Sequence, residues 1–290
     1  MEISENAQLK SASPSSIENG QEGEKQDHFS HVMQLVTSAS LPMVLYTAVK
    51  LNLFEIIAKA GPGAKLSPSE IACRLPTTKN PDAASMLDRM LRLLSSHSLL
   101  TYDVVEVAGG AETDIGYERV YGLSPVGEYL IPDEEGNSVA PLVELLLDKV
   151  LINTWYELGN AVLEGGIPFN RVHGTHAFDY PSRNPRYNEL FNNGMVGPTA
   201  ITMKELLQQY KGFELLQTLV DVGGGLGITL HKIIAKYPSI RGINFDLPHV
   251  IEDAPPYPGM EHIGGDMFES VPGGDAIFMK MILHDWSDDH

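Results

Sequence analysis

The stretch TLVDVGGGLGITLHKIIAKYP, residues 218–238, decides the fold. Its first five residues are mostly apolar, as in a strand buried inside a parallel sheet, and glycines follow at once. The remainder carries apolar residues at helical spacing and ends at Pro238. A second apolar run, GINFDLP at 242–248, comes after this helix. Alternation of strand and helix predicts an α/β domain with a parallel sheet.

The glycines after the first strand predict a ligand site. Glycine lets the backbone approach a ligand closely at the carboxyl edge of a sheet. Asp246 ends the second strand about 20 residues later, where an acidic side chain can hold ribose hydroxyls. The spacing of Gly223, Gly225 and Gly227 is one residue tighter than the dinucleotide fingerprint, and Ile228 stands at its last position. A nicotinamide oxidoreductase and a purely structural turn remain alternatives.

Four more motifs follow in order: INFDLPHV (243–250), GGDMF (264–268), DAIFMK (275–280) and HDWSD (284–288). With the glycine stretch, they resemble the plant caffeic acid and flavonoid O-methyltransferase family from about residue 28 to residue 290. The resemblance implies a Rossmann-like domain that binds S-adenosylmethionine and a helical N-terminal module that forms a homodimer. It also implies methyl transfer to a small phenolic compound.

The resemblance implies a role for each of five donor-site residues. Gly223 would lie beside the methionine part of S-adenosylmethionine, and Asp246 would hold its ribose. Asp266 and Met267 would contact the adenine, and Lys280 would close the site. Plain structural readings stay open, because Asp266 could cap a turn and Met267 could belong to the core. Lys280 could be a solvated lysine at the end of a strand.

By the same resemblance, His284 would be the general base. It follows the apolar run 276–283, which we expect to be a central strand, at the sheet edge where such folds place their chemistry. A phenol needs a base because its pKa is near 10. Asp285 and Ser287 could instead cap a helix, with His284 a mere edge residue. The other histidines show no metal-ligand spacing, so we expect a reaction without metal.

The residues of the acceptor pocket are harder to predict from the sequence than those of the donor site. The resemblance forms its wall from the stretch 177–195 and from these residues: Leu151, Tyr187, Phe191 and Met195. Each of them could equally be ordinary core. Caffeate-type relatives are expected to have histidines where this chain has Pro181 and Pro198. A coumarin, flavonoid, phenylpropene or alkaloid phenol is therefore as plausible an acceptor as caffeate.

The region 28–130 predicts a mainly helical module. Ser67, Pro68 and Glu70 form a helix start, with Ser67 as N-cap. Helices followed by the strand-like LLTYDVVEV and a short strand give a winged-helix outline, which leaves a non-enzymatic regulatory protein as a third alternative. Residues 65–128 contain six Lys and Arg but nine Asp and Glu, so this region is acidic. A wing that reads DNA should be basic. The apolar stretch 32–57 predicts a homodimer instead.

Composition limits the partners and the compartment. The formal net charge of −18 disfavours nucleic acid. Cys73 is the only cysteine, which fits a reducing cytoplasm. No apolar run reaches the ~18–20 residues of a membrane span, so we expect no membrane contact.

The expected organisation has four parts: a disordered tail at 1–27, the dimerisation module at 28–130, a helical linker with the acceptor region at 131–215, and a Rossmann-like domain at 216–290. Such a sheet usually has about seven strands. Only four can be placed, near Val220, Phe245, His262 and Phe278, so we expect this domain to be incomplete at its C-terminus.

Overall fold

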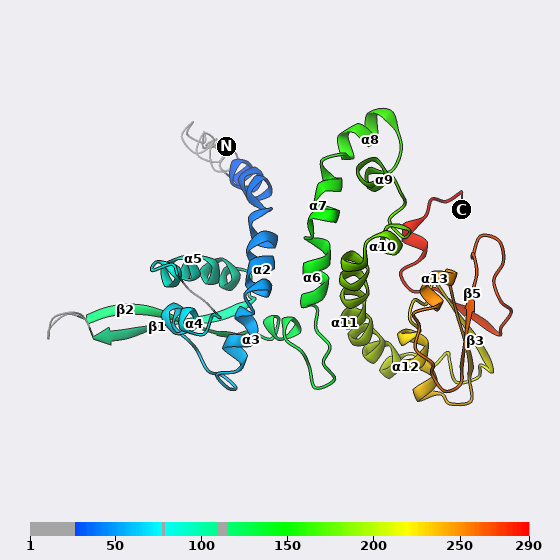
Figure 1. The fold of residues 1–290 in the computed structure, drawn as a ribbon. Helices are drawn as coiled ribbons and strands as arrows, with labels where there is room; N and C mark the ends of the chain where they lie inside the picture. Colours follow the sequence, from blue (N-terminus) through cyan, green and yellow to red (C-terminus); the bar gives the residue numbers. More distant parts are fainter. Residues whose placement is uncertain (1–26, 77–78, 109–114, 290) are drawn as a thin grey trace, which may run out of the picture.

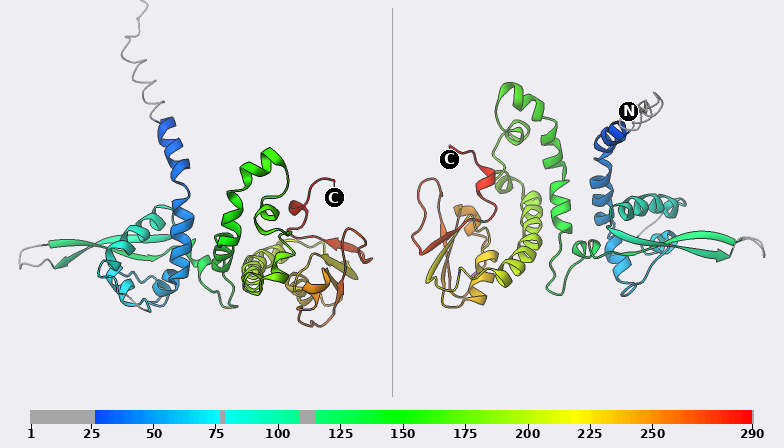
Figure 2. Two further views of the ribbon diagram at one scale, coloured as in Figure 1. Left: turned by 45° about the horizontal axis from the view of Figure 1, so that its top comes forward. Right: turned by 180° about the vertical axis from the view of Figure 1, so that it is seen from behind.

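The computed structural model describes residues 27–76, 79–108 and 115–289. The tail predicted at 1–27 lies outside these residues, except for Asp27, which is helical. Three parts follow one another along the chain and lie next to each other in the same order (Figures 1 and 2): N-terminal helices with a β-hairpin, a middle group of helices, and a parallel sheet.

The N-terminal part consists of helices followed by a hairpin, in the predicted order. Helix α4 begins with the predicted capping box, because the Ser67 hydroxyl accepts a bond from the Glu70 N–H and the Glu70 carboxylate accepts one from the Ser67 N–H. A helix over 27–37 precedes the named elements. These are α2 (Ser40–Lys50), α3 (Leu53–Ala58), α4 (Pro68–Cys73), α5 (Ala83–Ser96), β1 (Leu100–Ala108), β2 (Ile115–Leu123) and η1 (Gly127–Leu130).

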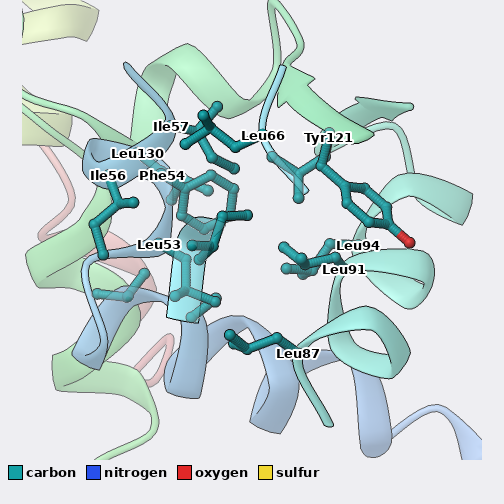
Figure 3. Close-up of a cluster of buried hydrophobic side chains, with 14 of the residues drawn as sticks. Leu53, Phe54, Ile56, Ile57, Leu66, Leu87, Leu91, Leu94, Tyr121 and Leu130 are labelled. Carbon is teal, nitrogen blue, oxygen red and sulfur yellow. The ribbon is translucent and has the colours of Figure 1, made fainter. Parts of the chain in front are cut away.

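One hydrophobic core joins these helices to the hairpin. Figure 3 shows it, with Leu53 and Ile57 of α3 facing Leu91 and Leu94 of α5, and with Tyr121 of β2 beside them. The Tyr121 hydroxyl donates to Asp88 Oδ1 at 2.6 Å, so the one polar atom of this ring is satisfied. The hairpin is thereby fixed to α5.

The first helical segment differs from the expectation about membranes. Asp27–Lys50 is 24 residues long, and its most apolar window has a mean hydropathy of 1.5, so by length and composition it could cross a bilayer. The expectation that no run reaches this length was wrong on that criterion. Only 11% of its most apolar window is buried, and Phe29, Val32, Leu35 and Val36 are exposed. This helix therefore presents an apolar face that the described residues do not cover.

The middle helices connect the N-terminal part to the sheet. Helix α11 packs along α6, and its Gly197 lies so close to Ser138 that a Cβ would come within 1.9 Å of the Ser138 carbonyl oxygen. Its second half reaches the sheet domain through Met203 and Leu207. These helices are α6 (Ala140–Leu146), α7 (Lys149–Trp155), α8 (Leu158–Glu164), α9 (Pro168–His173), α10 (Tyr180–Arg183) and α11 (Pro185–Gln209).

The four predicted strands form one parallel sheet, in the order β5-β4-β3-β6. Leu230 and Ile233 of α12 pack with Leu219 of β3. The predicted α/β class with a parallel sheet is confirmed. The elements are β3 (Thr218–Val222), α12 (Ile228–Lys236), β4 (Arg241–Asp246), α13 (Pro248–Ile251), β5 (Met260–Gly264), β6 (Ala276–Phe278) and η2 (Leu283–Asp285).

The last strand is shorter than predicted. We expected a central strand over 276–283, but β6 spans only Ala276–Phe278 and pairs within the described residues with β3 alone. Ile277 is accordingly 56% exposed. Beyond Phe278 the chain bends away, and Met281 has a φ of 60°. Strand pairing stops here because β3 itself ends one residue later, at Val222, and turns into the glycines.

Candidate functional site

The turn after β3 is so tight that side chains at Gly223 and Gly224 would clash with neighbouring residues. Gly223 has a φ of 67°, and a Cβ there would lie 2.3 Å from Cδ1 of Ile282. A Cβ on Gly224 would lie 2.1 Å from Oδ1 of Asn244. At Gly225 no atom lies within 4 Å of the Cβ position, so this side of the turn is open. A tight backbone with one open side fits the methionine part of S-adenosylmethionine at the carboxyl edge of the sheet.

Asp246 lies where the sequence predicted, at the end of β4 beside this turn. Its Oδ2 accepts a hydrogen bond from the Gly225 N–H, and its Oδ1 accepts one from the Leu247 N–H, both at 2.7 Å. Burial raises the pKa of Asp246, and the two backbone bonds oppose this rise. The carboxylate is thus held in a fixed orientation at the donor side of the sheet.

Asp266 and Met267 take local structural roles in the described residues. Asp266 is exposed, and its Oδ1 accepts from the Phe268 N–H at 2.9 Å, which caps the turn after β5. Met267 packs against the buried cluster of Val220, Val222, Ile243 and Phe245. Their contacts with an adenine stay predictions.

A buried acid, Asp221, lies beneath the turn and has no role in the sequence prediction. Asp221 is 1% exposed, and its pKa is raised to about 7, mainly by burial and also by the charge of Asp246, while Lys280 opposes the rise. Lys280 Nζ donates to Oγ1 of Thr199 at 3.0 Å, and burial lowers the pKa of Lys280. Lys280 therefore connects the sheet to α11 and is not a solvated strand-end lysine. A single charged residue in the run TLVDV was the available sequence signal for Asp221.

His284 lies in the short turn η2 and not at the end of a strand, because β6 ends six residues earlier. Its Nε2 lies 3.1 Å from Oδ1 of Asp285, and its side chain is 57% exposed. Burial raises the pKa of Asp285, and His284 and His176 lower it. An accessible imidazole beside a carboxylate can accept a proton and have the resulting charge stabilised.

Trp286 connects this turn to the predicted acceptor region. Its ring stacks on His176, with centroids 5.5 Å apart and an angle of 7° between the planes. Phe178 lies 6.0 Å from the same ring, and Phe268 meets it edge-on at 4.7 Å. The sequence analysis missed His176 and Trp286 as candidate wall residues, because nothing local marks two rings that meet only after folding.

The four predicted acceptor residues fall into two groups. Leu151, Tyr187 and Phe191 pack into one cluster with Phe169, and burial raises the pKa of Tyr187 to about 12. Phe191 also meets Phe178 edge-on, at 6.5 Å between centroids, so this cluster adjoins the rings around Trp286. Met195 is exposed. Among the described residues, Tyr187 therefore has the surroundings of a core residue.

Across residues 27–76, 79–108 and 115–289, no group of three or more His, Cys, Asp or Glu side chains is arranged to hold a metal ion. Metal independence stays a prediction.

Comparisons with known proteins match both halves of the chain. Residues 155–290 match the O-methyltransferase domain, and residues 33–133 match the O-methyltransferase dimerisation domain. A caffeic acid 3-O-methyltransferase of Prunus dulcis is 61% identical over 258 residues, which cover 89% of this chain and 69% of that protein. Cathecol O-methyltransferase 1 of Solanum lycopersicum is 54% identical over 279 residues, covering 93% and 74%.

Two solved structures resemble the fold. LaPhzM is 26% identical with a TM-score of 0.66, covering 90% of this chain and 73% of that one. Human N-acetylserotonin methyltransferase, solved in complex with S-adenosylmethionine, has a TM-score of 0.70 at 18% identity, with the same coverage. At that identity the second likeness supports the fold alone.

Proposed function

Because this chain belongs to the O-methyltransferase family, we propose that it methylates a phenolic hydroxyl of a small plant secondary metabolite, with His284 as the general base and no metal. The enzyme is an O-methyltransferase, and its cofactor is S-adenosylmethionine. The alternatives of a nicotinamide oxidoreductase and of a non-enzymatic module were therefore wrong. Phenylpropanoids, coumarins and flavonoids are the acceptor classes that we propose.

One observation carries the proposal: a five-residue segment joins the donor turn to an aromatic wall. At its start, Ile282 contacts Gly223 of the donor turn. At its end, Trp286 stacks on His176 and lies beside Phe178. His284 stands between these contacts. A base in this position can reach an acceptor hydroxyl that faces the donor.

The residues of this segment divide the chemistry between them. When bound, S-adenosylmethionine supplies a methyl group attached to a sulfonium. The leaving group is a neutral thioether, so no metal is needed to stabilise a leaving anion. The His284 imidazole accepts the phenol proton as the methyl group is transferred. Asp285, whose Oδ1 lies 3.1 Å from Nε2, stabilises the imidazolium that results. Asp285 thus orients and balances the base.

Planar rings of the protein support a planar aromatic acceptor. Trp286, Phe178 and Phe191 offer faces and edges against which a phenolic ring can pack. This chain has Pro181 and Pro198 at two positions where caffeate-type enzymes are expected to have histidines. Proline side chains cannot donate the hydrogen bonds that histidines could. An acceptor less polar than caffeate fits this wall better.

The partners and location follow from charge and composition. The dimerisation domain supports a homodimer. We propose a cytoplasmic enzyme without nucleic-acid or membrane partners, supported by the single cysteine and the net charge of −18.

A screen of phenols with radiolabelled S-adenosylmethionine tests this proposal. The wild-type chain and His284→Gln are compared, with His97→Gln at the end of α5 as a matched control. We expect His284→Gln to keep its affinity for S-adenosylhomocysteine and to lose turnover by roughly 10²–10⁴-fold. Turnover within a few-fold of wild type would exclude His284 as the base.

A further inference from the structure

Asn244 is a fully buried polar residue in the apolar strand β4, between the core residues Ile243 and Phe245. Its Nδ2 donates to the Gly225 carbonyl oxygen at 2.9 Å and to Nδ1 of His262 at 3.1 Å. A carbonyl oxygen only accepts, so the amide nitrogen must be the atom that faces Gly225. The orientation of the Asn244 amide is therefore determined.

His262 continues this network on the neighbouring strand. It is the direct partner of Asn244 in the parallel pairing of β4 with β5. Because its Nδ1 accepts from Asn244, its Nε2 carries the proton, and this atom donates to the Pro255 carbonyl oxygen at 3.0 Å. Its Cε1 would lie 3.2 Å from a Cβ on Gly227. The imidazole thus supports the turn at a second point.

Gly225 is held through both of its backbone polar groups. Its N–H donates to Asp246 at 2.7 Å, and its carbonyl oxygen accepts from Asn244. Asn244 Oδ1 and Asp221 Oδ2 have no partner among the described residues, and both face the Cβ position of Gly224. Both buried oxygens therefore border the space beside Gly224, directly next to the residue that Asn244 and Asp246 hold.

We propose that Asn244 and His262 are positioning residues for S-adenosylmethionine, which act through the carbonyl of Gly225 and keep the glycine turn in its binding conformation. Burial of an amide is costly unless the amide is hydrogen-bonded. If this network had no role, an apolar side chain at position 244 would suit the buried strand better. The amide instead fixes Gly225, the residue of the turn whose N–H also contacts Asp246. The turn is therefore pre-organised before the donor binds.

Two substitutions of His262 separate this role from packing. Asn places an acceptor oxygen near the position of Nδ1, whereas Gln places its amide nitrogen near Nε2. Affinity for S-adenosylhomocysteine is measured by calorimetry on the whole chain, with the melting temperature recorded for each variant. We expect His262→Asn to bind within about threefold of wild type and His262→Gln to bind at least tenfold more weakly.

Equal affinities of the two variants, whether both kept or both lost, would overturn the proposal, and so would the reverse order. If His262→Gln does not fold, Asn244→Ser tests the proposal, because the shorter serine side chain cannot reach the Gly225 carbonyl oxygen. Weaker binding of S-adenosylhomocysteine by folded Asn244→Ser, with faster hydrogen exchange at the Gly225 amide, supports the proposal. Unchanged binding contradicts it.

Discussion

The indole of Trp286 stacks on the imidazole of His176, with ring centroids 5.5 Å apart and planes 7° from parallel. This contact joins the turn that carries His284 to the segment between α9 and α10. Phe268, which follows β5, also meets the indole edge-on. The proposed base is therefore two residues away from the ring that joins these segments into one aromatic cluster.

Replacement of Trp286 should weaken acceptor binding. An aromatic pair contributes about 0.5–1.5 kcal/mol beyond its buried area, so Trp286→Leu is expected to raise the KM for a phenolic acceptor roughly 2–10-fold. Affinity for S-adenosylhomocysteine should stay unchanged. Trp155→Leu on α7, which removes an exposed indole, is the control. An unchanged KM in Trp286→Leu would mean that the acceptor lies elsewhere.

Asp246→Ala should weaken donor binding without changing the order of preferred acceptors. The carboxylate is already oriented by Gly225 and Leu247, and hydrogen bonds to a charged group contribute about 1.5–3 kcal/mol. We expect a loss of affinity for S-adenosylhomocysteine of roughly 10–150-fold by calorimetry. Asp253→Ala, an exposed acid after α13, serves as the comparison. Equal affinities of the two variants would place the ribose away from Asp246.

Features encoded in adjacent residues could be predicted from the sequence. The capping box at Ser67 and Glu70 is a local pattern, and the structure contains it. Asp246 was placed correctly because strand, helix and strand follow each other directly, so sequence spacing fixes its position at the sheet edge.

Other features depend on contacts that no local pattern encodes. The predicted strand leading to His284 was too long, because the end of β6 is set by where its neighbour β3 turns, and not by its own apolar residues. His176 meets Trp286 only after two distant segments fold together. Asn244 lies in an apolar run and shows its role only through Gly225 and His262.

Gly224→Ala should destabilise the donor turn. Its Cβ would lie 2.1 Å from Asn244 Oδ1 and 2.9 Å from Asp221 Oδ2, so buried groups would have to shift. Overpacking of this kind costs typically about 1–3 kcal/mol in the free energy of unfolding. Gly273→Ala, where no atom lies within 4 Å of the Cβ position, should change it by less than about 0.5 kcal/mol. Urea unfolding of both variants checks this, and equal stabilities would contradict it.

The exposed apolar face of the helix 27–37 should be the dimer contact. Leu35 is 61% exposed and Val36 70% exposed. A glutamate there would have to be desolvated in the interface. We expect light scattering at micromolar concentration to give a dimer for the wild type and a monomer for the double variant Leu35→Glu, Val36→Glu. Met86→Glu on α5, also an exposed apolar site, should stay dimeric. A dimeric double variant would move the interface elsewhere.

Asp221→Asn should change how stability depends on pH. Burial raises the folded-state pKa of Asp221 to about 7, far above that of an unfolded aspartate near 3.9. Between these values the folded state holds the proton more tightly than the unfolded state does. The contribution of Asp221 to stability is therefore fully present below about pH 4 and is lost as the pH rises to about 7. The slope can reach about 1.4 kcal/mol per pH unit.

Asparagine has no such proton and is uncharged at every pH. We therefore expect Asp221→Asn to gain stability relative to wild type when urea unfolding is measured at pH 8 instead of pH 5. Asp275→Asn should show no such change between pH 5 and pH 8, because the Gln217 and Thr218 N–H groups hold the pKa of Asp275 below its usual range and its carboxylate stays ionised throughout this window. The contribution of Asp275 is present at neutral pH and is lost as the pH falls through its folded-state pKa. A difference between Asp221→Asn and wild type that does not change with pH would show that Asp221 is already ionised in the folded enzyme.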